Sequence, residues 1–242
     1  MEIQLAVSKT NKYATSDSGD SVEVIERPNG GISVVMADGQ SSGKGAKQIS
    51  YLVVRKVISL LSEGVRDGAA ARAASDYLFT ERKGKVSSTL NIVSIDLQTA
   101  TMVITRNNPL PVLIVSTDEI CAFDDECNPI GLYRDTRPLI SEVPLEPGLL
   151  VVLYTDGLVH AGSRSGESLD IKTFLQSIID DEVDELDEEE ISPQKIADSL
   201  LAHAVQLDQG RPVDDITIVV IQVTSHKSDS VRRMNVVLPF NL

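Results

Sequence analysis

Four aspartates stand where apolar segments of this sequence meet loops. Asp38 and Asp156 each close a run rich in valine and leucine, and each precedes a glycine, whereas Asp20 and Asp214 lie just before such runs. In an antiparallel sheet the end of one strand lies beside the start of its neighbour, so we expect these carboxylates to gather at a sheet edge. Carboxylates packed that closely repel one another unless a cation binds them or one takes up a proton. All-oxygen ligands suit Mg²⁺, Mn²⁺ or Ca²⁺, so the sequence predicts a hard-metal site at the rim of a β structure.

The segments around these aspartates predict two sheets covered by helices. Valine- and isoleucine-rich runs, most of them apolar on both faces, favour strands covered on both sides. These runs are residues 22–25, 32–37, 90–97, 101–105, 111–116, 149–154 and 216–223. Helical spacing of apolar residues recurs over 44–61, 69–79, 169–179 and 193–207. Two mostly antiparallel sheets flanked by helix pairs bury both faces of each sheet, so we predict an α-β-β-α sandwich.

Composition favours one large domain and argues against polyanionic partners. The chain has 242 residues, 42% of them hydrophobic, which suits a single core, and we place one domain over residues 1–223. Its net charge of −14 argues against general binding of nucleic acid or anionic membranes. The two cysteines, Cys121 and Cys127, are interpreted as free thiols. The sequence shows no secretory signal and no apolar stretch of roughly 18 residues, so we expect a cytoplasmic protein.

Two segments fall outside this plan. Residues 180–190 hold nine acidic residues in eleven positions, and predict either a solvated loop or helix extension, or a docking patch for a basic partner. Residues 224–242 form a C-terminal extension, interpreted as an added strand or an interface segment.

Four motifs occur in order over about residues 15–223. They are Gly19-Asp20-Ser21, Ala37-Asp38-Gly39 through Ala46, Leu145-Glu146-Pro147-Gly148 through Leu158, and Asp214-Asp215-Ile216-Thr217. A lone Asp-Gly pair is weak evidence for a metal site, since it most often marks a hairpin turn. The ordered set is specific, and it resembles the metal-dependent protein serine/threonine phosphatases of the PPM type. Within that family the chain is most similar to the SpoIIE-like bacterial branch, and to its stand-alone RsbX-like members.

The resemblance implies two Mn²⁺ or Mg²⁺ ions in a cleft at the sheet edge. Carried over by position, Asp38 bridges both ions and is the catalytic residue. Asp20 and the Gly39 carbonyl serve one ion, and Asp156 and Asp214 serve the other. Asp215, the remaining carboxylate of the last motif, orients a ligand or a bound water.

The implied reaction is hydrolysis of phosphoserine or phosphothreonine on a regulatory protein. A metal-bridging hydroxide attacks phosphorus, so no phosphoenzyme forms. By family analogy the substrate is an anti-sigma-factor antagonist or a stressosome component, in bacterial stress or sigma-factor signalling.

Several positions depart from the family pattern. Many relatives carry glycine where Ser41 stands, and eukaryotic relatives carry a histidine at Gln40 that is thought to protonate the leaving group. A metal-bound water or Lys44 is left for that role. For Arg106 we favour a surface salt bridge over contact with substrate phosphate, and for His160 a surface or structural role over a place in the cleft.

Two other functions compete with the phosphatase. One is a non-catalytic phosphoprotein-binding module on the same fold, which the changed loop at Ser41 keeps open although every matched aspartate is present. The other is an unrelated β-rich protein that binds Ca²⁺ structurally. An EF-hand is excluded, because no Asp-x-Asp-x-Asp-Gly loop occurs.

Overall fold

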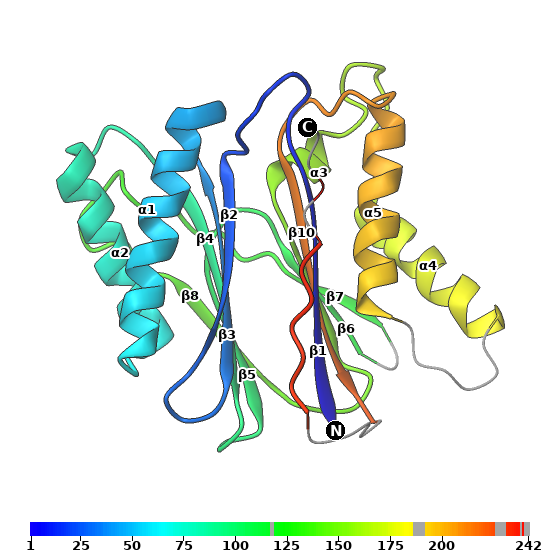
Figure 1. The fold of residues 1–242 in the computed structure, drawn as a ribbon, viewed down its shortest axis with the longest axis horizontal. Coiled ribbons are helices and arrows are strands. Elements are labelled where there is room, and N and C mark those ends of the chain that lie inside the picture. The colour runs from blue at the N-terminus through cyan, green and yellow to red at the C-terminus, as the bar shows by residue number, and fades with distance from the viewer. Residues whose placement is uncertain (117–118, 186–191, 226–230, 238, 240–242) are drawn as a thin grey trace.

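Two antiparallel sheets lie face to face, and helices cover the outer face of each (Figure 1). This computed structural model describes residues 1–116, 119–185, 192–225, 231–237 and 239. The architecture confirms the predicted α-β-β-α sandwich. The strands are β1 (Glu2–Thr10), β2 (Asp20–Glu26), β3 (Ile32–Gly39), β4 (Ser88–Asp96), β5 (Thr101–Asn107), β6 (Val112–Val115), β7 (Ile120–Phe123), β8 (Leu139–Pro144), β9 (Leu150–Tyr154) and β10 (Ile216–Thr224). The helices are α1 (Gly43–Ser62), α2 (Asp67–Arg82), α3 (Asp156–His160), α4 (Ile171–Glu185) and α5 (Pro193–Leu207).

Each sheet has five strands, and its order decides which chain segments meet at the site. The first sheet runs β1-β10-β9-β6-β7 and the second runs β2-β3-β4-β5-β8. Helices α1 and α2 pack on the second sheet, whereas α4 and α5 lie over the first (Figure 1). The long central strands therefore have protein on both faces.

Three apolar clusters hold these layers together. In β3, Val34 faces the interior between the sheets while Val35 packs against α1 and α2. In β10, Val219 faces the same interior and Val220 packs toward α4 and α5. All nine residues of β10 are buried. Burial on both faces explains why these strands appear in the sequence as unbroken apolar runs.

The seven predicted strands and four predicted helices are all present, but three strands and one helix among the described residues were not predicted. Strand β8 lies at a sheet edge and alternates half-buried with exposed residues. Strand β1, also at an edge, combines a short apolar run with polar residues at both ends of Glu2–Thr10. Strand β7 has four residues and α3 has five, too few to show a period. Edge strands need fewer apolar residues, so they gave a weak signal.

The two segments outside the predicted plan are described only in part. Helix α4 extends to Glu185, so it includes the start of the acidic run, and 186–190 lie outside the described residues. Residues 231–237 form no strand, and the division of the chain at residue 223 stays a prediction. Among the described helices, none is long and apolar enough to cross a membrane.

Candidate metal centre

The two sheets each contribute one pair of the predicted aspartates. Asp20 opens β2 and lies directly opposite Asp38 in β3. Asp156 follows β9, and Asp214 precedes β10, which pairs with β9 in the first sheet. The expectation of a single sheet edge is therefore corrected. Each pair forms by antiparallel pairing within a sheet, and packing of the two sheets brings the pairs together.

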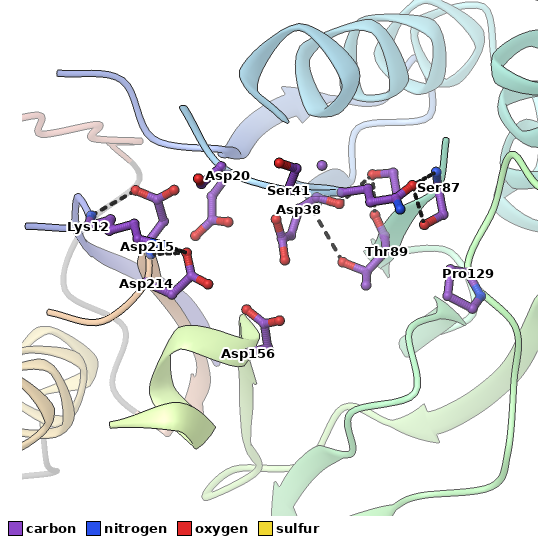
Figure 2. Close-up of a pocket in the computed structure, with 14 residues that line it drawn as sticks. Lys12, Asp20, Asp38, Ser41, Ser87, Thr89, Pro129, Asp156, Asp214 and Asp215 are labelled. Carbon is purple, nitrogen blue, oxygen red and sulfur yellow. Dashed lines mark hydrogen bonds and ion pairs between the residues drawn. The ribbon is translucent and has the colours of Figure 1, made fainter. Parts of the chain in front are cut away.

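The aspartates line one cleft of about 390 Å³ (Figure 2). All of the predicted site residues reach it. The lining is Lys12, Asp20, Asp38, Gly39, Gln40, Ser41, Ser42, Ser87, Ser88, Thr89, Pro129, Asp156, Asp214 and Asp215. Sequence reasoning missed the start of β4: the Ser88 hydroxyl donates to the Asp38 carbonyl (2.7 Å), and the Asp38 amide donates to Thr89 Oγ1 (3.3 Å). A polar triplet just before the apolar run 90–97 was the available signal.

Crowding of carboxylates perturbs the central residue most. Burial first, and then the charges of Asp20, Asp156 and Asp214, raise the pKa of Asp38 to about 9. Burial also raises the pKa of Asp20 to about 6, although hydroxyl donors oppose that shift. At neutral pH and without a cation, Asp38 therefore holds a proton. An all-oxygen cluster that must protonate unless a cation is present fits a hard divalent metal.

Asp20 is held by two buried threonines. Its Oδ2 accepts hydrogen bonds from Thr155 Oγ1 (2.9 Å) and Thr217 Oγ1 (2.6 Å). Asp20 is 1% exposed and Thr217 is fully buried, so no solvent competes for these bonds. Both threonines fall inside the motifs quoted above, but their role could not be assigned from spacing.

The two consecutive aspartates before β10 differ in their surroundings. Asp215 is buried, and its two oxygens accept the main-chain amides of Lys12 (2.9 Å) and Gly19 (2.8 Å). Asp214 is partly exposed, with Oδ1 3.9 Å from Lys12 Nζ. Asp215 therefore holds the loop that leads to Asp20, whereas Asp214 keeps oxygen atoms directed to the cleft (Figure 2). This geometry suits the predicted division of roles between them.

Both Asp-Gly pairs mark close approaches rather than hairpin turns. A Cβ atom at Gly39 would collide with the Ala46 carbonyl in α1, and one at Gly157 would collide with the Asp215 carbonyl. Each glycine thus lets a second segment of the site lie against the aspartate that precedes it.

The positions that depart from the family pattern have definite environments. Gln40 Oε1 accepts the Ser87 amide (2.9 Å), so its side chain closes the rim of the cleft. Ser41 has φ +82°, a conformation that glycine adopts at little cost, and Lys44 is exposed. His160 Nδ1 lies 4.0 Å from Asp156 Oδ2. His160 is exposed and does not line the cleft, which agrees with the expected surface role, although one ligand atom each from Asp156, His160 and Asp214 lie within 4.8 Å of one another.

The surface salt bridge expected for Arg106 is wrong. Arg106 is 3% exposed, and its guanidinium donates to the carbonyls of Asn108 (2.9 Å), Leu110 (3.1 Å) and Asp125 (2.5 Å). Its donors are used to hold the loops after β5 and β7, so it does not line the cleft.

The family model for Stage II sporulation protein E (SpoIIE) matches residues 28–224. The chain belongs to the SpoIIE family. It is 24% identical over 208 residues to Stage II sporulation protein E of Bacillus subtilis (strain 168), covering 85% of this chain and 24% of that protein. The corresponding protein of Priestia megaterium is 23% identical over 206 residues, covering 85% of this chain and 34% of its own. The chain thus spans about a quarter to a third of these SpoIIE relatives.

Solved structures share the fold. The PP2C phosphatase domain of B. subtilis SpoIIE, solved with a fragment of its regulatory domain, has a TM-score of 0.77 and 22% identity, covering 94% of this chain and 64% of that one. RsbX in complex with magnesium has a TM-score of 0.67 and 17% identity, covering 92% and 96%. The catalytic domain of the phosphatase PstP, with two manganese ions, has a TM-score of 0.67 and 16% identity, covering 92% and 99%. The fold of this SpoIIE-family chain is therefore that of PPM phosphatases.

Proposed function

We propose that this SpoIIE-family chain is a metal-dependent phosphatase acting on phosphoserine or phosphothreonine. The observation that carries the proposal is the convergence of five aspartates from two sheets on one cleft, with the pKa of Asp38 raised to about 9. Such a cluster is stable with ionised carboxylates only when cations neutralise it. Family membership and the shared fold support the same activity.

Five residues would hold two Mn²⁺ or Mg²⁺ ions, and a sixth would orient the site. We propose Asp38 as the bridging residue, with Asp20 and the Gly39 carbonyl for one ion and Asp156 and Asp214 for the other. When bound, such ions supply an activated water and positive charge for the phosphoryl oxygens. We assign Asp215 to orienting the site, because it binds the amides of Lys12 and Gly19.

The remaining lining residues suit an anionic substrate beside these carboxylates. Among the described residues that line the cleft, Lys12 is the basic one, and its ammonium lies at the acidic side. Ser87 and Gln40 form the opposite rim and offer polar atoms to a peptide segment. Two candidates remain for the acid that protonates the leaving group: the exposed Lys44 and a metal-bound water. Gln40 cannot take this role, because its side chain has no acidic proton.

The proposed substrate is a phosphorylated regulatory protein in bacterial stress or sigma-factor signalling, such as an anti-sigma-factor antagonist or a stressosome component. Fold neighbours named RsbX, the RsbU and RsbW domains of Rv1364c, and a protein described under the bacterial stressosome support this choice by analogy.

Hydrolysis of a small aryl phosphate, measured with and without Mn²⁺, tests the proposal. Wild type should turn over only with metal. Asp38→Asn should abolish turnover and weaken Mn²⁺ binding while the circular dichroism spectrum stays unchanged. Near-wild-type turnover by this variant would show that Asp38 does not bridge the ions. Metal binding without turnover, on both the aryl phosphate and phosphoproteins, would favour the non-catalytic binding module.

A further inference from the structure

Two lysines from opposite layers of the sandwich bind the same main-chain oxygen. Lys9 in β1 and Lys47 in α1 each donate from Nζ to the Asp20 carbonyl, both at 2.8 Å. Lys47 also donates to Ser21 Oγ (3.0 Å). Strand β1 belongs to the first sheet, whereas α1 covers the second. The two ammonium groups therefore join the layers at the residue that opens β2.

Two ammonium groups that bind the same oxygen repel each other, so other interactions must offset that repulsion. Burial and the charge of Lys47 lower the pKa of Lys9, whereas Asp20, Asp215 and Asp38 raise it. The nearby carboxylates thus offset the repulsion between the ammonium groups. An arrangement that combines burial with like-charge repulsion persists only when the surrounding structure holds it in place.

Hydrogen bonds therefore hold both the main chain and the side chain of Asp20. The two lysines bind its main-chain carbonyl, and Thr155 and Thr217 bind one oxygen of its carboxylate. These four donors come from β1, α1, the residue that follows β9, and β10. The side chain is directed into the cleft opposite Asp38 (Figure 2).

We propose that Lys9 and Lys47 are positioning residues that hold Asp20 in the orientation in which its carboxylate serves a metal ion. The inference rests on the metal centre of the proposed function. It concerns the orientation of a ligand, since neither lysine is among the residues that line the cleft. Loss of either lysine removes one of the two donors that hold the Asp20 carbonyl, and a ligand that is held less firmly binds metal more weakly.

If the lysines acted only through their charge, removing one would change the Mn²⁺ affinity in the opposite direction, which makes the inference testable. Removing a positive charge beside a cation site strengthens cation binding when charge is the only effect. Removing a positioning residue weakens it, typically by about 10- to 100-fold for groups that support metal ligands. The direction of the change in Mn²⁺ affinity therefore separates the two roles.

The experiment is Mn²⁺ titration by calorimetry, with free Mn²⁺ followed by electron paramagnetic resonance. We compare wild type with Lys47→Met and Lys9→Met. Lys56→Met is the matched control, because Lys56 is also on α1 but contacts the ring of Tyr77. Lys47→Arg keeps the charge and donors and tests rescue. Thermal melts without metal report whether each variant is folded.

We expect the dissociation constant of one Mn²⁺ to rise about 10- to 100-fold in Lys47→Met and Lys9→Met. Lys56→Met should match wild type, and Lys47→Arg should recover most of the affinity. Turnover should return at saturating Mn²⁺, so the metal requirement changes more than kcat. Unchanged or tighter Mn²⁺ binding in folded Lys→Met variants would overturn the inference.

Failure of the proposed function gives a different pattern. A wild type that binds Mn²⁺ but hydrolyses no phosphate overturns the phosphatase, while the binding titration still decides the role of the lysines. A wild type that binds no Mn²⁺ overturns the metal centre and this inference together. If the Met variants do not fold, Lys47→Gln is titrated in their place, at a low temperature at which it is folded.

Discussion

Replacing Thr217 with valine removes one hydrogen bond to Asp20 while keeping the shape of the side chain. The bond joins Thr217 Oγ1 to Asp20 Oδ2 at 2.6 Å, and both residues are buried. A hydrogen bond to an ionised group contributes about 1.5–3 kcal/mol, and one between neutral groups about 0.5–1.5 kcal/mol. The cost of Thr217→Val therefore depends on whether Asp20 is charged.

The ionisation of Asp20 makes this cost depend on pH. Burial raises the pKa of Asp20 to about 6 in the folded protein, above the ordinary 3.8. Between these values the folded protein holds a proton that the unfolded chain has released, so stability falls as pH rises through this window. Thr217 opposes the shift by bonding to the carboxylate. Without it the pKa rises further, and the fall in stability extends to higher pH.

We therefore expect metal-free Thr217→Val to lose about 2 kcal/mol at pH 8 and about 1 kcal/mol at pH 5. For a chain of this size the loss at pH 8 lowers Tm by about 4–8 °C. Urea denaturation at both pH values, without metal, measures the difference. Thr105→Val is the control: Thr105 is 1% exposed and its hydroxyl has no partner among the described residues, so its removal should be neutral or stabilising. An equal loss at both pH values, or a larger one at pH 5, would refute the ionised Asp20 carboxylate as the acceptor.

Two further predictions concern positions outside the ligand set. Arg106→Lys should destabilise the protein by about 3 kcal/mol, because one ammonium cannot replace a buried guanidinium that binds three carbonyls; a change below about 0.5 kcal/mol in urea denaturation would instead fit an exposed side chain. Ser41→Gly should raise Tm by about 1–3 °C, since Ser41 has φ +82° and glycine accepts that conformation. Ala100→Gly is the control: Ala100 has φ 53° in the turn before β5, and its replacement should raise Tm by a similar amount. If Tm is unchanged or lower in Ser41→Gly alone, the serine side chain stabilises the loop.

The central strands were predictable because burial on both faces leaves a continuous apolar run. Strand β10 is buried throughout and was found within one residue of its ends. Edge strands β1 and β8 were missed because one side of each is open to solvent, which admits polar residues. Arg106 was misjudged for a related reason. A charged side chain near the end of a strand predicts exposure, and only the folded loops supply the carbonyls that bind it when it is buried.

The order and spacing of acidic residues by themselves determined the kind of site. Aspartates at strand ends, each beside a glycine or an apolar run, predict a hard-metal cluster, because strand ends and turn residues are local features of the sequence. Tertiary structure decided that two sheets share the cluster and which residues support it. Lys9 lies 11 positions from Asp20, whereas Thr155 and Thr217 lie 135 and 197 positions away. Contacts across such separations depend on how the layers pack, and no local pattern records them.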